Sequence, residues 1–71
     1  MNEHYSMVIE WSNEDQLYIV SLPEWGPGAK THGVTYEEAA RAGHELLETL
    51  LAHADAGEME RPMPRVYVAA G

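Results

Sequence analysis

The chain has 71 residues, and its twelve acidic residues against four Lys or Arg give a formal net charge of −8 at pH 7. This length suits a single domain, and the lack of cysteine excludes disulfides, a thiolate nucleophile and thiolate metal sites. The scattered cations argue against nucleic-acid binding, which requires clusters of Lys and Arg, and the lack of a long apolar run predicts a cytoplasmic protein without a membrane span or a signal peptide.

Alternating apolar and polar residues predict two strands near the start of the chain, over residues 5–11 and 16–22. The polar residues 12–15 between them have turn chemistry, so the strands are expected to form an antiparallel hairpin. If Trp11 pairs with Gln16, one face collects most of the large apolar side chains. These are Tyr5, Met7, Ile9, Trp11, Tyr18, Val20 and Leu22.

The opposite face of the hairpin then holds Val8, Leu17 and Ile19 among polar residues. A one-residue slip would redistribute the two sets, because strand side chains alternate with period two. One helix can cover only one face of a small sheet, so we expect these residues to form the interface of a homodimer or a higher homo-oligomer. A half-polar face that is open to solvent is the alternative.

The middle and the end of the chain predict two more short strands. Pro23 ends the second strand, and the loop after it carries Trp25, which we place in loop packing or at an interface, whereas Trp11 is expected in the core. A third strand is predicted over 29–33, and a last one over 65–69, after the helix described next.

A long helix is predicted from residue 36 to about residue 56. Thr35 is a good N-cap, Glu38 completes a capping box three residues later, and Gly57 ends the helix. Gly43 lies within the apolar stripe of the helix, which indicates a close approach to the sheet. The predicted fold is therefore α+β in β-β-β-α-β order, with one long helix packed on one face of a small antiparallel sheet.

The helix also carries the clearest candidates for metal binding or catalysis. His44, Glu48 and Asp55 share one helical face, which would suit a divalent cation in a small metal-dependent hydrolase or nuclease. Hydrolytic metal sites, however, gather three or more ligands with supporting hydrogen bonds in a cleft, and acidic pairs in turns lack the environment that catalysis requires. We therefore expect a solvated helix face, with no metal, no cofactor and no enzymatic activity.

Several short motifs follow one another in a recognisable order. The strand 5–11 and the acidic turn 13–15 precede Leu-Pro-Glu at 22–24, a Gly-x-Thr-x-x-Glu-Ala signature at 33–39 and Pro-x-Pro at 62–64. Each motif is weak alone, but in this order and spacing they resemble the HicB-like antitoxin family over nearly the whole chain.

The resemblance implies a single domain over residues 1–71 with a partial RNase-H-like fold and no RNase activity. It also implies an antitoxin that sequesters a small, basic, mRNA-cleaving toxin of the HicA type by masking its active surface. The acidic charge suits a basic partner, although a role in solubility alone would explain it equally. We place the toxin-binding surface on acidic and aromatic residues: Asp15, Tyr18, Glu24 and Trp25.

Two further points concern operator binding and an alternative function. Members of the family commonly add a C-terminal segment that binds operator DNA, and this sequence stops at Gly71, just after the predicted last strand, so we do not expect operator binding. The alternative function is an orphan homo-oligomeric structural or regulatory domain that has no toxin partner.

Overall fold

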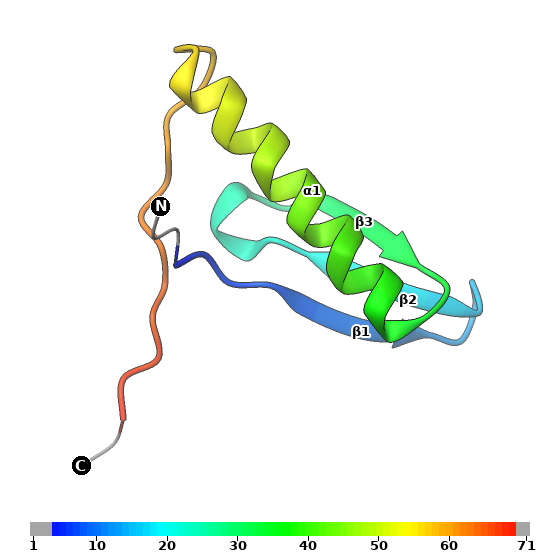
Figure 1. Ribbon diagram of the computed structural model, residues 1–71. Coiled ribbons are helices and arrows are strands. Elements are labelled where there is room, and N and C mark those ends of the chain that lie inside the picture. The colour runs from blue at the N-terminus through cyan, green and yellow to red at the C-terminus, as the bar shows by residue number, and fades with distance from the viewer. Residues whose placement is uncertain (1–3, 70–71) are drawn as a thin grey trace.

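The fold is a three-stranded antiparallel sheet with one long helix across one face (Figure 1). The computed structural model describes residues 4–69. The elements in chain order are β1 (Val8–Ser12), β2 (Leu17–Ser21), the 3-10 helix η1 (Pro23–Trp25), β3 (Lys30–Gly33) and α1 (Tyr36–Asp55). The strands lie in the order β1-β2-β3, so the predicted α+β class and the β-β-β-α order are confirmed.

The hairpin of β1 and β2 has its turn one residue later than predicted. Trp11 lies opposite Tyr18 and Ser12 lies opposite Leu17, so the turn is formed by residues 13–16. The N–H of Gln16 donates to the carbonyl of Ser12 (2.9 Å), and Gln16 itself has a left-handed φ of 56°. The partner of Trp11 is thus Tyr18 instead of the predicted Gln16. Because this shift is two residues and side chains alternate with period two, both faces of the hairpin keep the predicted side chains.

The core lies between β2 and the first half of α1. Val20, Leu22 and Ala39 have no exposed surface. A Cβ atom on Gly43 would lie 2.8 Å from Cγ1 of Val20 and 2.9 Å from Cε of Met7. The predicted close approach of the helix to the sheet at Gly43 is therefore confirmed.

Gly33 permits a second close approach, where β3 ends and α1 begins. A Cβ atom at this position would lie 2.3 Å from the backbone nitrogen of Ala39. A backbone atom cannot move aside as the end of a flexible side chain can, so this position requires glycine. The start of α1 is consequently held directly against the end of β3.

Both ends of α1 are capped by the residues that the sequence predicts. Oγ1 of Thr35 accepts a hydrogen bond from the N–H of Glu38 (3.1 Å). The Glu38 carboxylate in turn accepts one from the N–H of Val34, just before the helix (2.8 Å). At the other end Gly57 has a φ of 81° and the N–H of Glu58 donates to the carbonyl of His53 (3.0 Å). This is the geometry of a Schellman motif.

The helix is longer than the sheet that it covers. Its 20 residues span about 30 Å, whereas a strand of 5 residues such as β1 spans about 17 Å. The second half of α1 therefore projects beyond the sheet (Figure 1). The leucines of its apolar stripe are consequently only half-buried: Leu46, Leu47, Leu50 and Leu51.

The predicted last strand over residues 65–69 is wrong. After α1 the chain returns past the start of β1 and then runs away from the sheet (Figure 1). Within the described chain, the last hydrogen bonds of this segment are made by Arg65. A strand exists only where a partner strand runs alongside it, and the strand-forming sequence that follows Arg65 does not specify where that partner lies.

Candidate functional site

Three aromatic side chains meet at the turn end of the hairpin, and we call them the aromatic corner: Trp11 of β1, Tyr18 of β2 and Tyr36 of α1. The ring centroids of Trp11 and Tyr18 are 5.1 Å apart with an interplanar angle of 70°. Those of Tyr18 and Tyr36 are 5.5 Å apart at 77°. Edge-to-face pairs of this kind contribute about 0.5–1.5 kcal/mol beyond their buried area, so the three rings hold one another in place.

Regular secondary structure positions each ring of the aromatic corner. Trp11 and Tyr18 are direct cross-strand partners on the face that α1 covers. Gly33 lies opposite Tyr18 on β3, and the close approach there brings the first helical residue, Tyr36, onto the same cluster. Nε1 of Trp11 donates to Oδ1 of Asn13 (3.0 Å). The polar atom of the indole is therefore satisfied within the domain, and its apolar surface is left to face outward.

Much of the aromatic corner is open to solvent. Trp11 is 50% exposed and Tyr36 is 60% exposed. Trp and Tyr are enriched at interface hot spots, where they bury a large area at little loss of side-chain freedom. Exposed carboxylates adjoin the rings along the chain: Glu14, Asp15 and Glu37. The aromatic corner thus combines preorganised apolar rings with neighbouring negative charge.

The four predicted partner-binding residues fall into two separate places. Asp15 and Tyr18 lie at the aromatic corner, where the exposed Asp15 exchanges hydrogen bonds of 3.2 Å with the hydroxyl of Ser12. Glu24 and Trp25 lie in η1, at the opposite end of the sheet (Figure 1). The structure therefore does not bring the four residues together on one surface.

Trp25 packs within the domain, in agreement with its predicted role in loop packing. It is half-buried, and its ring centroid lies 5.1 Å from that of Tyr5. Its Nε1 atom is buried and has no hydrogen-bond partner within the described residues. The contact attaches the N-terminal segment to η1.

The carboxylate of Glu24 joins two segments that are distant in the sequence, and we call its contacts the Glu24 latch. It accepts hydrogen bonds from the N–H of Ser6 (3.0 and 3.1 Å to its two oxygens) and from the N–H of Arg65 (2.8 Å). Burial favours the neutral acid and raises the pKa of Glu24, but the hydrogen bonds from Arg65 and Ser6 outweigh this effect and the pKa lies below its usual value. The negative charge of Glu24 is therefore stabilised by hydrogen bonds within the domain.

The residues predicted to form an oligomer interface lie on the sheet face opposite α1. Val8 is 40% exposed there, and Leu17 and Ile19 are half-buried. Glu10 and His32 are the cross-strand neighbours of Ile19, so the face mixes apolar and charged side chains. Neither a helix nor a strand of the described chain covers this face (Figure 1).

The candidate metal ligands on α1 do not converge. His44 and Glu48 are exposed, and Nε2 of His44 lies 3.5 Å from Oε2 of Glu48. Asp55 instead forms an ion pair with Arg61 (2.6 Å). Among residues 4–69 no three His, Cys, Asp or Glu side chains gather in a way that could hold a metal ion. That part of the chain also contains no pocket.

The expectation that Trp11 lies in the core is wrong, and Tyr36 is a surface aromatic residue that the sequence analysis missed. Trp11 does point to the helical side of the sheet, but α1 lies mainly over β3 and β2 and touches β1 least. The capping signal at Thr35 could have located Tyr36, because it fixes this residue at the exposed first turn of the helix.

Comparisons of the chain with protein-family models, with characterised proteins and with solved structures find no match. Within the described residues, no helix combines the length and the apolar character needed to cross a membrane. The features of the described residues that indicate a function are therefore the geometry of the aromatic corner and the charge that surrounds it.

Proposed function

We propose that this domain is an antitoxin-type protein-binding module of the HicB-like kind, which acts in the cytoplasm and sequesters a small, basic, mRNA-cleaving toxin of the HicA type. The observation that carries the proposal is the aromatic corner, in which the exposed rings of Trp11 and Tyr36 are held in edge-to-face contact with the half-buried ring of Tyr18. A partial RNase-H-like fold belongs to the same proposal, and the β-β-β-α order supports it.

The charge of the domain explains why a basic ribonuclease suits this surface. A ribonuclease binds the phosphates of RNA through Lys and Arg side chains. The net charge of −8 attracts such a surface and speeds the encounter, and the aromatic rings then supply the buried apolar area. Occupation of the Lys and Arg residues by the antitoxin would exclude RNA from the toxin.

The proposal is tested with a small basic ribonuclease encoded beside this gene. The measurement is how strongly the domain inhibits the cleavage of RNA by that ribonuclease. Trp11→Ala should weaken binding by about 2 kcal/mol, roughly 30-fold, because truncated Trp hot spots lose this much. Tyr36→Ala should weaken binding by a smaller factor. His44→Ala, on the outer face of α1, is the matched control and should inhibit as the wild type does. Wild-type inhibition by the Trp11→Ala/Tyr36→Ala double variant would contradict the proposal.

The uncovered sheet face favours a second candidate, an orphan homo-oligomeric structural or regulatory domain. Its apolar residues Val8, Leu17 and Ile19 have no cover from an element of the described chain, and an apolar face of this kind is stabilised by a second copy. This candidate requires that no basic partner binds and that Ile19→Glu dissociates the oligomer. Sedimentation velocity would measure that dissociation.

A further inference from the structure

The segment 66–69 has the composition of a strand but lacks a partner strand. Val66, Tyr67 and Val68 are 64%, 91% and 79% exposed. Residues 66–69 make no hydrogen bond to any other residue that the structure describes. β-branched and aromatic residues favour strands because they fit a pleated, half-buried surface. The segment would therefore gain stability at the open edge of a sheet.

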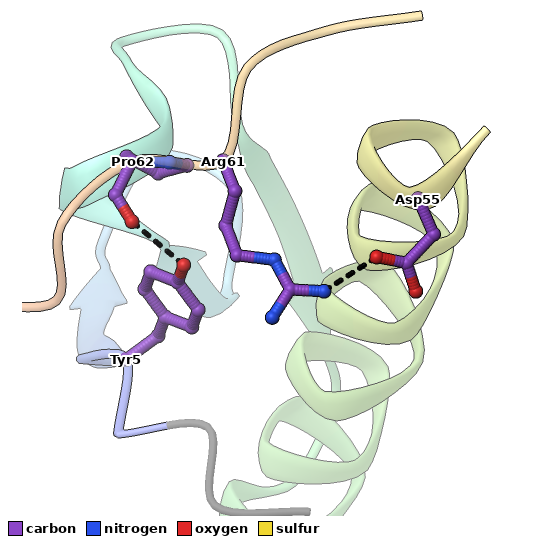
Figure 2. A network of polar contacts seen from close by, with 4 residues as sticks. All are labelled: Tyr5, Asp55, Arg61 and Pro62. Atoms are coloured by element: carbon purple, nitrogen blue, oxygen red, sulfur yellow. Dashed lines mark hydrogen bonds and ion pairs between the residues drawn. The ribbon is translucent and has the colours of Figure 1, made fainter. Parts of the chain in front are cut away.

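The chain immediately before this segment is held firmly against the domain (Figure 2). Its contacts are the ion pair of Arg61 with Asp55 (2.6 Å), the hydrogen bond from the hydroxyl of Tyr5 to the carbonyl of Pro62 (2.6 Å) and the Glu24 latch at Arg65. The hydroxyl of Ser6 also donates to the carbonyl of Arg65 (3.3 Å). Residues 66–69 thus leave the domain from a fixed point, which lowers the entropic cost of ordering them on another surface.

The outer edge of β1 is the edge that an added strand can best join. The order β1-β2-β3 leaves one edge of β1 and one edge of β3 unpaired in the described sheet. The helix α1 lies mainly over β3 and β2, whereas Val8 and Trp11 of β1 remain 40% and 50% exposed. The β3 edge begins with Lys30, and a lysine at an edge discourages pairing.

Charge favours the same pairing between two copies of the chain. Residues 61–71 contain two arginines and no acid, whereas residues 1–60 contain all twelve acids and two cations. The formal charges of the two parts are therefore +2 and, from twelve acids against two cations, −10. Arg61 is paired with Asp55 of its own chain, so the charge that attracts the C-terminal segment to the acidic body of another copy is that of the exposed Arg65.

We propose that residues 66–69 of one copy add as a fourth strand to the outer edge of β1 in a second copy, which returns the same contact. Each chain carries one donor segment and one acceptor edge, so a two-fold axis satisfies both and closes the dimer. Within its own chain the segment passes the start of β1 and runs away from the sheet (Figure 1). The acceptor is therefore the second copy.

Proline substitutions in the full chain test the strand exchange. Val66→Pro/Val68→Pro removes two N–H donors from the added strand, and the exchange occurs twice in the dimer, so dimer affinity should fall by about 100-fold or more. Val66→Thr/Val68→Thr keeps the β-branched shape and the N–H groups, and this control should dimerise as the wild type does. Sedimentation velocity at micromolar concentration measures both. A monomeric wild type, or a dimer that survives the prolines and dissociates with Ile19→Glu, would overturn the inference.

A spin label locates the acceptor edge directly. The chain has no cysteine, so Ala69→Cys provides a single labelling site. Chains that carry the spin label are mixed with ¹⁵N-labelled chains that do not carry it. The amide signals of β1 (Val8–Ser12) in the ¹⁵N-labelled chains should then broaden. Broadening of β1 only when the same chain carries the label would show intrachain pairing and overturn the proposal. The proline variant should still inhibit the toxin, so failure of the strand exchange is distinguishable from failure of the proposed function.

Discussion

The two ends of the sheet are held together in different ways. At the turn end, the aromatic corner is built from regular elements, since Trp11 and Tyr18 are cross-strand partners and Tyr36 begins the helix. At the other end, the Glu24 latch joins segments by hydrogen bonds from backbone N–H groups to one carboxylate, across sequence separations of 18 and 41 residues. The turn end therefore depends on local structure, and the latch end depends on one charged group.

This difference bears on function. The polar groups of the Glu24 latch are already paired with each other, so they have little capacity left for a partner. At the aromatic corner, Trp11 and Tyr36 are exposed but fixed in position by the half-buried Tyr18, which is the combination expected of a preorganised binding surface. We therefore propose that a partner binds at the turn end, whereas the latch end holds the N-terminal and C-terminal segments together.

Gly33→Ala should have the largest effect, because it acts at the turn end, where α1 starts against β3. The new Cβ would lie 2.3 Å from the Ala39 backbone nitrogen, and relief of this clash should lower the free energy of unfolding by about 3 kcal/mol or more. Gly28→Ala has no neighbouring atom within 4 Å and is the matched control. Urea unfolding followed by circular dichroism measures both. Equal stability of the two variants would mean that the helix start is not fixed by this contact.

Glu24→Gln should have the next largest effect, because it weakens the latch end alone. Hydrogen bonds to an ionised carboxylate are stronger than those to a neutral amide, so the free energy of unfolding at neutral pH should fall by about 1–2 kcal/mol. Glu14→Gln, in the exposed hairpin turn, should be neutral. The backbone amide signals of Ser6 and Arg65 should shift in the first variant and stay in place in the second.

The pH dependence of the Glu24→Gln effect follows from the lowered pKa of Glu24. A carboxyl group whose pKa is lower in the folded state stabilises that state above the unfolded pKa, which is about 4.3 for Glu. This stabilisation is lost as the pH falls through the unfolded and then the folded pKa. The difference between wild type and variant should therefore be constant near neutral pH and disappear in acid. A difference that persists at the lowest pH would contradict the role of the carboxylate.

Thr35→Ala should have a smaller effect, again at the turn end. Loss of the N-cap hydrogen bond to the N–H of Glu38 should lower the free energy of unfolding by about 1 kcal/mol. The loss should also broaden the ring signals of Tyr36, which directly follows the cap. Thr49→Ala removes an exposed helical threonine whose hydroxyl donates to the carbonyl of Glu45, and this control should leave both readouts nearly unchanged.

Asp55→Asn should have the smallest effect, although it also acts on the C-terminal segment. The ion pair with Arg61 lies at the surface, with side chains 63% and 37% exposed, and such pairs contribute about 0.2–1 kcal/mol. High salt should remove most of the difference from the wild type. A larger loss of stability than that caused by Glu24→Gln would show that this ion pair, rather than the Glu24 latch, holds the segment.

The sequence predicted best those features that depend on near neighbours. Period-two alternation gave the two hairpin faces even though the turn was placed one residue too early, and the caps at Thr35 and Gly57 were located correctly. Gly43 was also interpreted correctly, because a glycine in an apolar stripe indicates close packing.

The errors concern contacts that the sequence pattern cannot specify. The segment 65–69 has strand propensity, but propensity does not provide a partner strand, and the segment leaves the sheet. The hydrogen bonds of Glu24 to Ser6 and Arg65 were missed, because these N–H donors lie far away in the sequence. Trp11 faces the helical side of the sheet, but the helix lies mainly over β3 and β2.

The most direct test of the assignment of partner binding to the turn end is an NMR footprint. The ¹⁵N spectrum of the domain would be recorded with and without the candidate basic ribonuclease. We predict that the indole N–H of Trp11 and the amides of Tyr18 and Tyr36 shift, while those of Ser6 and Arg65 at the Glu24 latch do not. Shifts centred on Val8, Leu17 and Ile19, or on the latch, with an unperturbed aromatic corner would contradict this assignment.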